Sequence, residues 1–156
     1  GLGMGYTLAA ALRRLGQAAQ VEVEELVSAV VAWNRGVLRD LAGHPLRDER
    51  VVVREVDVAE LLQAEWGGYD AILLDVDNGP NGLTRPENNR LYAREGLSAA
   101  FAALKPGGVL AVWSARPDER FTRRLRKAGF EVSETSLRSR GVRGGERHTI
   151  WHARKA

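Results

Sequence analysis

The feature that most constrains the fold of this chain is an apolar run near its middle. Residues 70–75 read Asp-Ala-Ile-Leu-Leu-Asp, so four consecutive apolar side chains lie between two acids. Because side chains alternate between the two faces of a strand, an unbroken apolar run predicts a strand that is covered on both faces, as in a parallel sheet. Parallel strands need long crossover connections, so helices should separate the strands.

The rest of the chain shows this alternation. Further strand patterns occupy residues 21–24, 51–56 and 109–113, and helical spacing of apolar residues occurs over 8–15, 27–41, 58–65, 97–104 and 121–128. Two final strand patterns, 130–137 and 148–153, have no helix between them and predict an antiparallel pair. We therefore expect a single α/β domain over residues 1–156, Rossmann-like, with a mostly parallel sheet covered by helices and a C-terminal antiparallel hairpin.

A glycine-rich loop precedes the first helical pattern. Gly1, Gly3 and Gly5 alternate with Leu2 and Met4, which lets the backbone approach a ligand closely, and the following helix offers free N–H groups. Such a loop normally leaves the end of a strand. No strand pattern stands before Gly1, so we expect that the first strand is missing from this sequence and that the natural protein is longer at its N-terminus.

The amino-acid composition excludes several classes of site and protein. The sequence has no cysteine, which excludes disulfides and thiolate metal sites, and no apolar run approaches the about 20 residues that cross a bilayer. We expect a cytoplasmic protein that does not contact a membrane. Residues 116–156 hold 12 Lys/Arg against 5 Asp/Glu. We interpret this basic segment as a solvated arginine-rich surface and do not expect nucleic acid as a partner.

Acids follow three of the predicted strands. Glu25, Asp57 and Asp75 each stand where a strand pattern ends, and ligands of open α/β sheets lie beyond the carboxyl ends of the strands. Glu25 comes 20 residues after Gly5, a spacing that suits a carboxylate accepting both hydroxyls of a ribose. The glycine loop and the three acids together predict a nucleoside site.

The spacing of the glycines indicates which kind of nucleoside ligand the loop binds. A dinucleotide fingerprint needs a small residue where this chain has Tyr6, so we do not expect a dinucleotide. The spacing G-x-G-x-G, with the terminal hairpin, resembles the S-adenosylmethionine-dependent methyltransferase fold.

A narrower resemblance covers residues 1 to about 114. Its motifs are Gly3-x-Gly5-x-Thr7-Leu8, the strand ending at Glu25, Asp48-x-Arg50-Val51 leading to Asp57, Tyr69-Asp70-x-Ile72 leading to Asp75, and Leu104-Lys105-Pro106-Gly107-Gly108. In these motifs the chain resembles the spermidine synthase family.

The resemblance implies roles for individual residues. The donor would be S-adenosylmethionine or its decarboxylated form, with Glu25 on the ribose and Asp57 on the adenine amine. Asp75 would help to deprotonate the attacking amine. The remaining implied positions at the donor are Gly1, Gly3, Gly5, Leu26, Val58 and Asp75 itself, and Asp77 would be a second catalytic acid.

Three further residues are candidates for an acceptor pocket. Asn78 lies in the loop after Asp75, Tyr92 follows that loop, and Trp113 ends a central strand. We expect Trp33 and Trp66 to pack in or beside the core.

Three functions stay open at this stage. They are transfer of an aminopropyl group to a polyamine, methyl transfer to an unidentified small-molecule acceptor, and a non-catalytic nucleoside-binding or assembly module. We expect a homodimer. We expect no metal, because His44, His148 and His152 are scattered, and we interpret all three as surface residues.

Overall fold

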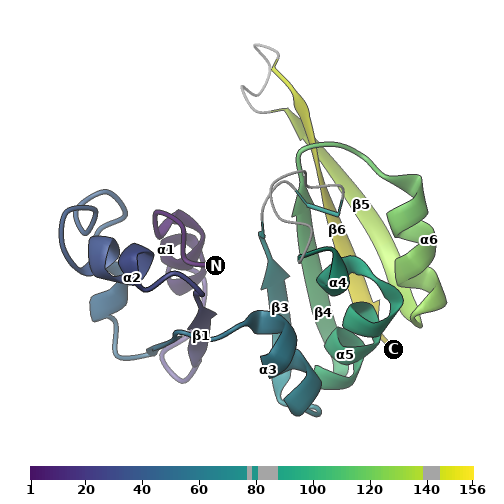
Figure 1. The fold of residues 1–156 in the computed structure, drawn as a ribbon, viewed down its shortest axis with the longest axis horizontal. Coiled ribbons are helices and arrows are strands. Elements are labelled where there is room, and N and C mark those ends of the chain that lie inside the picture. Colours follow the sequence, from purple (N-terminus) through teal and green to yellow (C-terminus); the bar gives the residue numbers. More distant parts are fainter. Residues whose placement is uncertain (77–78, 81–87, 139–144) are drawn as a thin grey trace. The chain divides into compact units, whose positions relative to one another are not determined.

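The computed structural model describes residues 1–76, 79–80, 88–138 and 145–156. It consists of two compact units, Gly1–Glu60 and Leu61–Ala156, each with its own sheet (Figure 1). The first unit is built around a two-stranded sheet and the second around a four-stranded sheet.

The first unit pairs two parallel strands. β1 lies beside β2 in register, with Val21 opposite Val51. Leu2, Leu8, Leu12, Val23 and Val31 form its buried core. In chain order its elements are α1 (Tyr6–Leu12), β1 (Val21–Glu24), α2 (Ser28–Arg35), a 3-10 turn η1 (Pro45–Arg47) and β2 (Val51–Arg54).

Two predicted helices end earlier than expected. α1 stops at Leu12 instead of residue 15, and α2 stops at Arg35 instead of residue 41. Gly36 caps α2 with φ −109° and ψ −107°, outside the helical region, and the chain then turns. The predicted apolar stripe therefore breaks after Arg35, and Val37 is 82% exposed.

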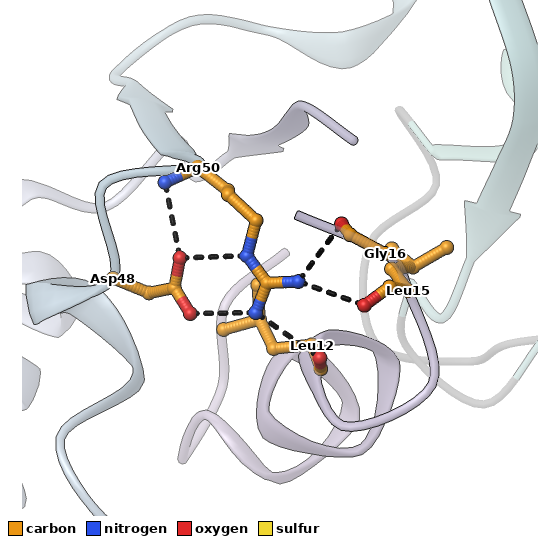
Figure 2. A network of polar contacts seen from close by, with 5 residues as sticks. All are labelled: Leu12, Leu15, Gly16, Asp48 and Arg50. Atoms are coloured by element: carbon orange, nitrogen blue, oxygen red, sulfur yellow. Dashed lines mark hydrogen bonds and ion pairs between the residues drawn. The ribbon is translucent and has the colours of Figure 1, made fainter. Parts of the chain in front are cut away.

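Arg50 joins the start of β2 to the end of α1 (Figure 2). Its guanidinium donates to both carboxylate oxygens of Asp48, at 2.9 and 2.7 Å. It also donates to three backbone carbonyls at the end of α1, those of Leu12, Leu15 and Gly16, at 2.9–3.1 Å. A cation at the C-terminal end of a helix satisfies carbonyls that lack helical partners.

Removing the charge of Asp48 should destabilise the first unit in a pH-dependent way. Hydrogen bonds from Arg50 lower the pKa of Asp48 from 3.8 to about 2. The ionised carboxylate thus contributes stability above pH 3.8, and this contribution is lost as the pH falls through about 2. We expect Asp48→Asn to lower the melting temperature at pH 7 and the difference from wild type to close near pH 2. A difference independent of pH would contradict the charge-based explanation; Glu49→Gln is the control.

The second unit contains a mixed sheet in the order β3-β4-β6-β5. β3 and β4 are parallel, whereas β4–β6 and β6–β5 are antiparallel. α5 packs against β4 and α6 against β5 (Figure 1). The remaining elements of the chain are α3 (Val58–Ala64), which crosses from one unit to the next, β3 (Tyr69–Leu74), α4 (Asn89–Tyr92), α5 (Arg94–Ala103), β4 (Leu104–Ser114), α6 (Glu119–Lys127), β5 (Phe130–Arg138) and β6 (Arg147–Lys155).

The predicted fold class is confirmed by this topology. Crossover helices separate the parallel strands, and the last two strands form the expected antiparallel pair. One detail differs, since Ile72 and Leu74 are buried but Leu73 is 54% exposed. Within the second unit, the face of β3 that carries Ile72 and Leu74 is therefore buried and the face that carries Leu73 is exposed, whereas two covered faces were predicted. The single domain over 1–156 stays a prediction.

The core of the second unit is mostly aliphatic and includes aromatic side chains that contact one another. Phe121 of α6 lies edge-on to Trp151 of β6, with ring centroids 4.9 Å apart, and both are fully buried. Trp33 and Trp66 were predicted to pack in or beside the core; neither is buried, and Trp66, at 81% exposed against 53% for Trp33, contradicts the prediction. Trp33 lies on α2 with the buried Val31 and Asn34 but is itself exposed, and Trp66 lies in the turn before β3.

No helix in the described residues is long and apolar enough to cross a membrane.

Candidate functional site

The glycine loop is tied to the end of β1 by one carboxylate. Glu25 is 9% exposed; its Oε2 accepts the Leu2 N–H at 2.8 Å, and its Oε1 accepts the Val27 N–H at 2.9 Å. Leu2 belongs to the loop, and Val27 caps α2. Because an ionised carboxylate only accepts hydrogen bonds, each oxygen can serve one backbone N–H and still accept from a ligand.

Asn34 supports the same loop from α2. Its Nδ2 donates to the Gly3 carbonyl at 2.8 Å and to the Val30 carbonyl at 2.9 Å, and the side chain is 4% exposed. Asn34 was not among the site residues predicted from the sequence. Its signal was a polar side chain three residues after Val31, on the apolar face of the helix.

A side chain at Gly5 would be strained in this geometry. Its φ is +79°, and a Cβ there would lie 3.1 Å from the Asn34 Oδ1 and 3.2 Å from Pro45. Its N–H donates to the Leu2 carbonyl at 2.9 Å, which closes a turn immediately before α1. The loop is therefore fixed by Glu25 on one side and by Asn34 on the other.

Asp57 lies beyond the end of β2. Its Oδ1 accepts the Ala59 N–H at 2.8 Å, as a helix-capping side chain does at the start of α3. Since Glu24 and Arg54 are opposite each other at the ends of two parallel strands, Glu25 and Asp57 follow at the same edge of the β1–β2 sheet. The structure thus brings most of the predicted donor residues to one edge of the first unit: Gly1, Gly3, Gly5, Glu25, Leu26, Asp57 and Val58.

Glu24, the residue before Glu25, has a different environment. Burial raises its pKa, and the neighbouring charge of Glu22 raises it further, against the lowering effect of Arg54. Its Oε1 is buried with no hydrogen-bond partner among the described residues. The two adjacent glutamates are therefore not equivalent, because both carboxylate oxygens of Glu25 accept hydrogen bonds, whereas the buried Oε1 of Glu24 has no partner among the described residues.

The predicted catalytic acid lies in the second unit. Asp75 directly follows β3 and is exposed. The next residue, Val76, accepts a hydrogen bond at its carbonyl from the Tyr92 hydroxyl at 2.9 Å. Tyr92 is 1% exposed, so the prediction that it lines an acceptor pocket is corrected: its ring lies in the core, and its hydroxyl holds the segment after the acid. Asp77 and Asn78 lie outside the described residues.

Trp113 lies beside the end of β3. Leu74 is the register partner of Val112, so Asp75 and Trp113 directly follow paired residues. The Trp113 ring is half-buried and lies 5.1 Å from the His148 ring, tilted by 33°. His148 is therefore half-buried against an indole instead of the surface residue predicted.

The other two histidines have local partners. His44 Nε2 lies 3.0 Å from an Asp40 carboxylate oxygen, and His152 Nε2 lies 3.2 Å from the Thr135 hydroxyl. Within the ranges that the structure describes, no group of three His, Asp or Glu side chains could hold a metal ion.

The chain has detectable relatives in sequence and in structure. No family model matches it. A polyamine aminopropyltransferase from Oceanobacillus iheyensis is 34% identical over 103 residues, which is 65% of this chain and 19% of that protein. A spermidine synthase structure in complex with the transition state analogue AdoDATO matches the whole chain with a TM-score of 0.82 and 22% identity, over 53% of its own length.

A methyltransferase matches as well. An S-adenosylmethionine-dependent O-methyltransferase from Thermotoga maritima covers the whole chain at a TM-score of 0.66 and 19% identity, over 57% of its length. These likenesses confirm the Rossmann-like methyltransferase fold and the predicted resemblance to spermidine synthases. The chain spans about a fifth of the curated relative and about half of each solved structure. All three relatives are transferases, in agreement with the predicted enzyme class.

Replacing Glu25 by glutamine should loosen the loop. Glutamine keeps one acceptor oxygen and replaces the other by an amide donor, so either the Leu2 or the Val27 N–H loses its partner. We expect Glu25→Gln to lower the free energy of unfolding by about 1–3 kcal/mol in denaturant titrations, the cost of one unsatisfied buried donor. Glu22→Gln, on the strand that precedes Glu25, is the control; it weakens an ion pair with Arg54 and leaves the loop's backbone bonds in place. Equal effects of the two variants would contradict the role of Glu25.

Proposed function

We propose that this chain is the nucleoside-binding part of a transferase that uses an adenosyl sulfonium donor. The preferred reaction is transfer of the aminopropyl group of decarboxylated S-adenosylmethionine to a polyamine. The observation that carries the donor assignment is the glycine loop held by Glu25 at the end of β1. The polyamine acceptor is supported by the partial match to a polyamine aminopropyltransferase.

The donor site follows from the groups at the edge of the β1–β2 sheet. The free lone pairs of Glu25 accept the two ribose hydroxyls, since both carboxylate oxygens are already fixed by backbone N–H groups. Asp57 accepts from the adenine amine, beside Val58. Gly1, Gly3 and Gly5 let the backbone approach the sulfonium side of the donor without a side chain intervening.

The chemistry is a displacement at a carbon bonded to the sulfonium. The amine nitrogen of the acceptor forms a bond to that carbon while the carbon–sulfur bond breaks, and its electron pair passes to sulfur, giving a neutral thioether. The attacking amine must be neutral, so Asp75 takes its proton, with Asp77 as the second acid. Asn78 and Trp113 contact the acceptor. The protein's larger contribution is to hold donor and acceptor in line.

Methyl transfer is the alternative reaction. The same donor site would hold S-adenosylmethionine, and the likeness to an O-methyltransferase favours this possibility. A non-catalytic nucleoside-binding module would need the donor site only. The homodimer and the cytoplasmic location stay predictions.

Product analysis separates these possibilities. We expect the chain with decarboxylated S-adenosylmethionine and putrescine or spermidine to yield the aminopropylated amine by mass spectrometry. Asp75→Asn should reduce kcat by about 10²- to 10⁴-fold, the usual contribution of a positioned base. Asp70→Asn, an exposed acid at the other end of β3 that pairs with Lys105, is the control.

Each negative outcome removes a definite part of the proposal. A methylated product with S-adenosylmethionine alone would replace aminopropyl transfer by methyl transfer. Full activity of Asp75→Asn would remove this residue as the base. Donor binding without product from either donor, in the natural full-length protein, would leave the nucleoside-binding module.

A further inference from the structure

The segment after Asp75 is held at two points in the second unit. The first is the carbonyl of Val76, which accepts from the Tyr92 hydroxyl at 2.9 Å and from the Gly79 N–H at 3.3 Å. Asp75 itself is exposed and directly precedes Val76. A bond to the Val76 carbonyl therefore acts on the backbone next to the acid and leaves the acid's side chain accessible.

The side chain of Tyr92, which donates this hydrogen bond, is held in place by the core. The side chain is 1% exposed, and its ring lies edge-on to Phe121 at 5.8 Å. Phe121 lies edge-on to Trp151, whose Nε1 donates to the Thr122 hydroxyl at 2.8 Å. This aromatic series runs from α4 through α6 to β6, so the position of the Tyr92 hydroxyl is fixed by the core.

The helix that carries Tyr92 is also fixed. Gly96 of α5 packs so closely on α4 that a Cβ there would lie 2.3 Å from the Arg90 carbonyl and 2.5 Å from the Leu91 carbonyl. α4 therefore cannot shift away from its place without separating from α5.

The second fixed point is Gly79. Its φ is +89°, and a Cβ there would lie 2.5 Å from the Cβ of Ser114. Ser114 is the last residue of β4 and is 3% exposed. The backbone of Gly79 thus rests directly on the end of the neighbouring parallel strand.

We propose that Tyr92 is a positioning residue for the catalytic acid: its hydroxyl, together with the contact of Gly79 on Ser114, sets the backbone from which Asp75 reaches the acceptor. The inference rests on the proposed function. A base must lie within hydrogen-bond reach of the proton that it takes, and a misplacement of about 1 Å can cost on the order of 10²-fold in rate. Tyr92 acts through Val76 and does not touch the acceptor.

The hydroxyl, and not the ring, carries this role. A buried hydroxyl costs free energy unless it is hydrogen-bonded, and phenylalanine would fill the same core space without that requirement. Tyr92→Phe therefore removes the bond to Val76 and keeps the packing against Phe121. Tyr69→Phe removes the same group at the opposite end of β3 and is the matched control.

Two measurements test the inference. Amide hydrogen exchange should become at least several-fold faster at Val76 and Gly79 in Tyr92→Phe, with α5 unchanged, and in Tyr69→Phe these two amides should stay as in wild type. In the aminopropyl transfer assay, Tyr92→Phe should lower kcat roughly tenfold and leave the KM for the donor unchanged. Gly79→Ala, which displaces the other fixed point, should give the same pattern.

The outcomes are distinguishable from those of the proposed function. Wild-type exchange at Val76 and Gly79 in Tyr92→Phe would overturn the inference, whether or not the protein transfers an aminopropyl group. Faster exchange with an unchanged kcat would also overturn it, since the held backbone would then not position the base. If wild type forms no product while exchange responds as expected, the proposed function fails and Tyr92 is shown to hold the segment only.

Discussion

The first unit depends on one carboxylate that bonds to backbone on both of its oxygens. Glu25 at the end of β1 fixes Leu2 before α1 and Val27 before α2, so the starts of two helices and the end of a strand meet at one side chain. Asn34 then holds Gly3 from the opposite direction. The conformation of the glycine loop is therefore part of the fold, and a ligand that uses it does not have to pay the entropy of ordering it.

In the second unit, packed residues likewise fix the backbone next to an acid, Asp75. Asp75 is exposed, yet the backbone that follows it is held by a buried tyrosine and by a glycine resting on Ser114. In each unit the packed interior thus fixes a short segment: the glycine loop in the first and the backbone after Asp75 in the second. Such support is what a site needs to keep its geometry within fractions of an ångström.

Local patterns predicted most of the fold, because strands and helices leave periodic apolar signatures. The parallel pairing, the terminal hairpin and the ends of β1 and β2 as places for Glu25 and Asp57 followed from them. Contacts between distant residues could not be predicted. α2 ends at Gly36, Trp33 turns outward, and Tyr92 turns into the core. Asn34 gave only a weak signal, a polar residue on an apolar helix face, and its partner Gly3 is 31 residues away.

Equilibrium binding of an adenosyl sulfonium ligand to wild type and to Glu25 variants decides whether the glycine loop is a donor site. Calorimetry with S-adenosylmethionine and its decarboxylated form should show saturable binding to wild type and to Asp75→Asn. Binding should weaken at least tenfold in Glu25→Ala, which removes both the ribose acceptor and the support of the loop. Equal affinity of wild type and Glu25→Ala, or no binding of either ligand to the natural full-length protein, would contradict the assignment of the glycine loop as a donor site.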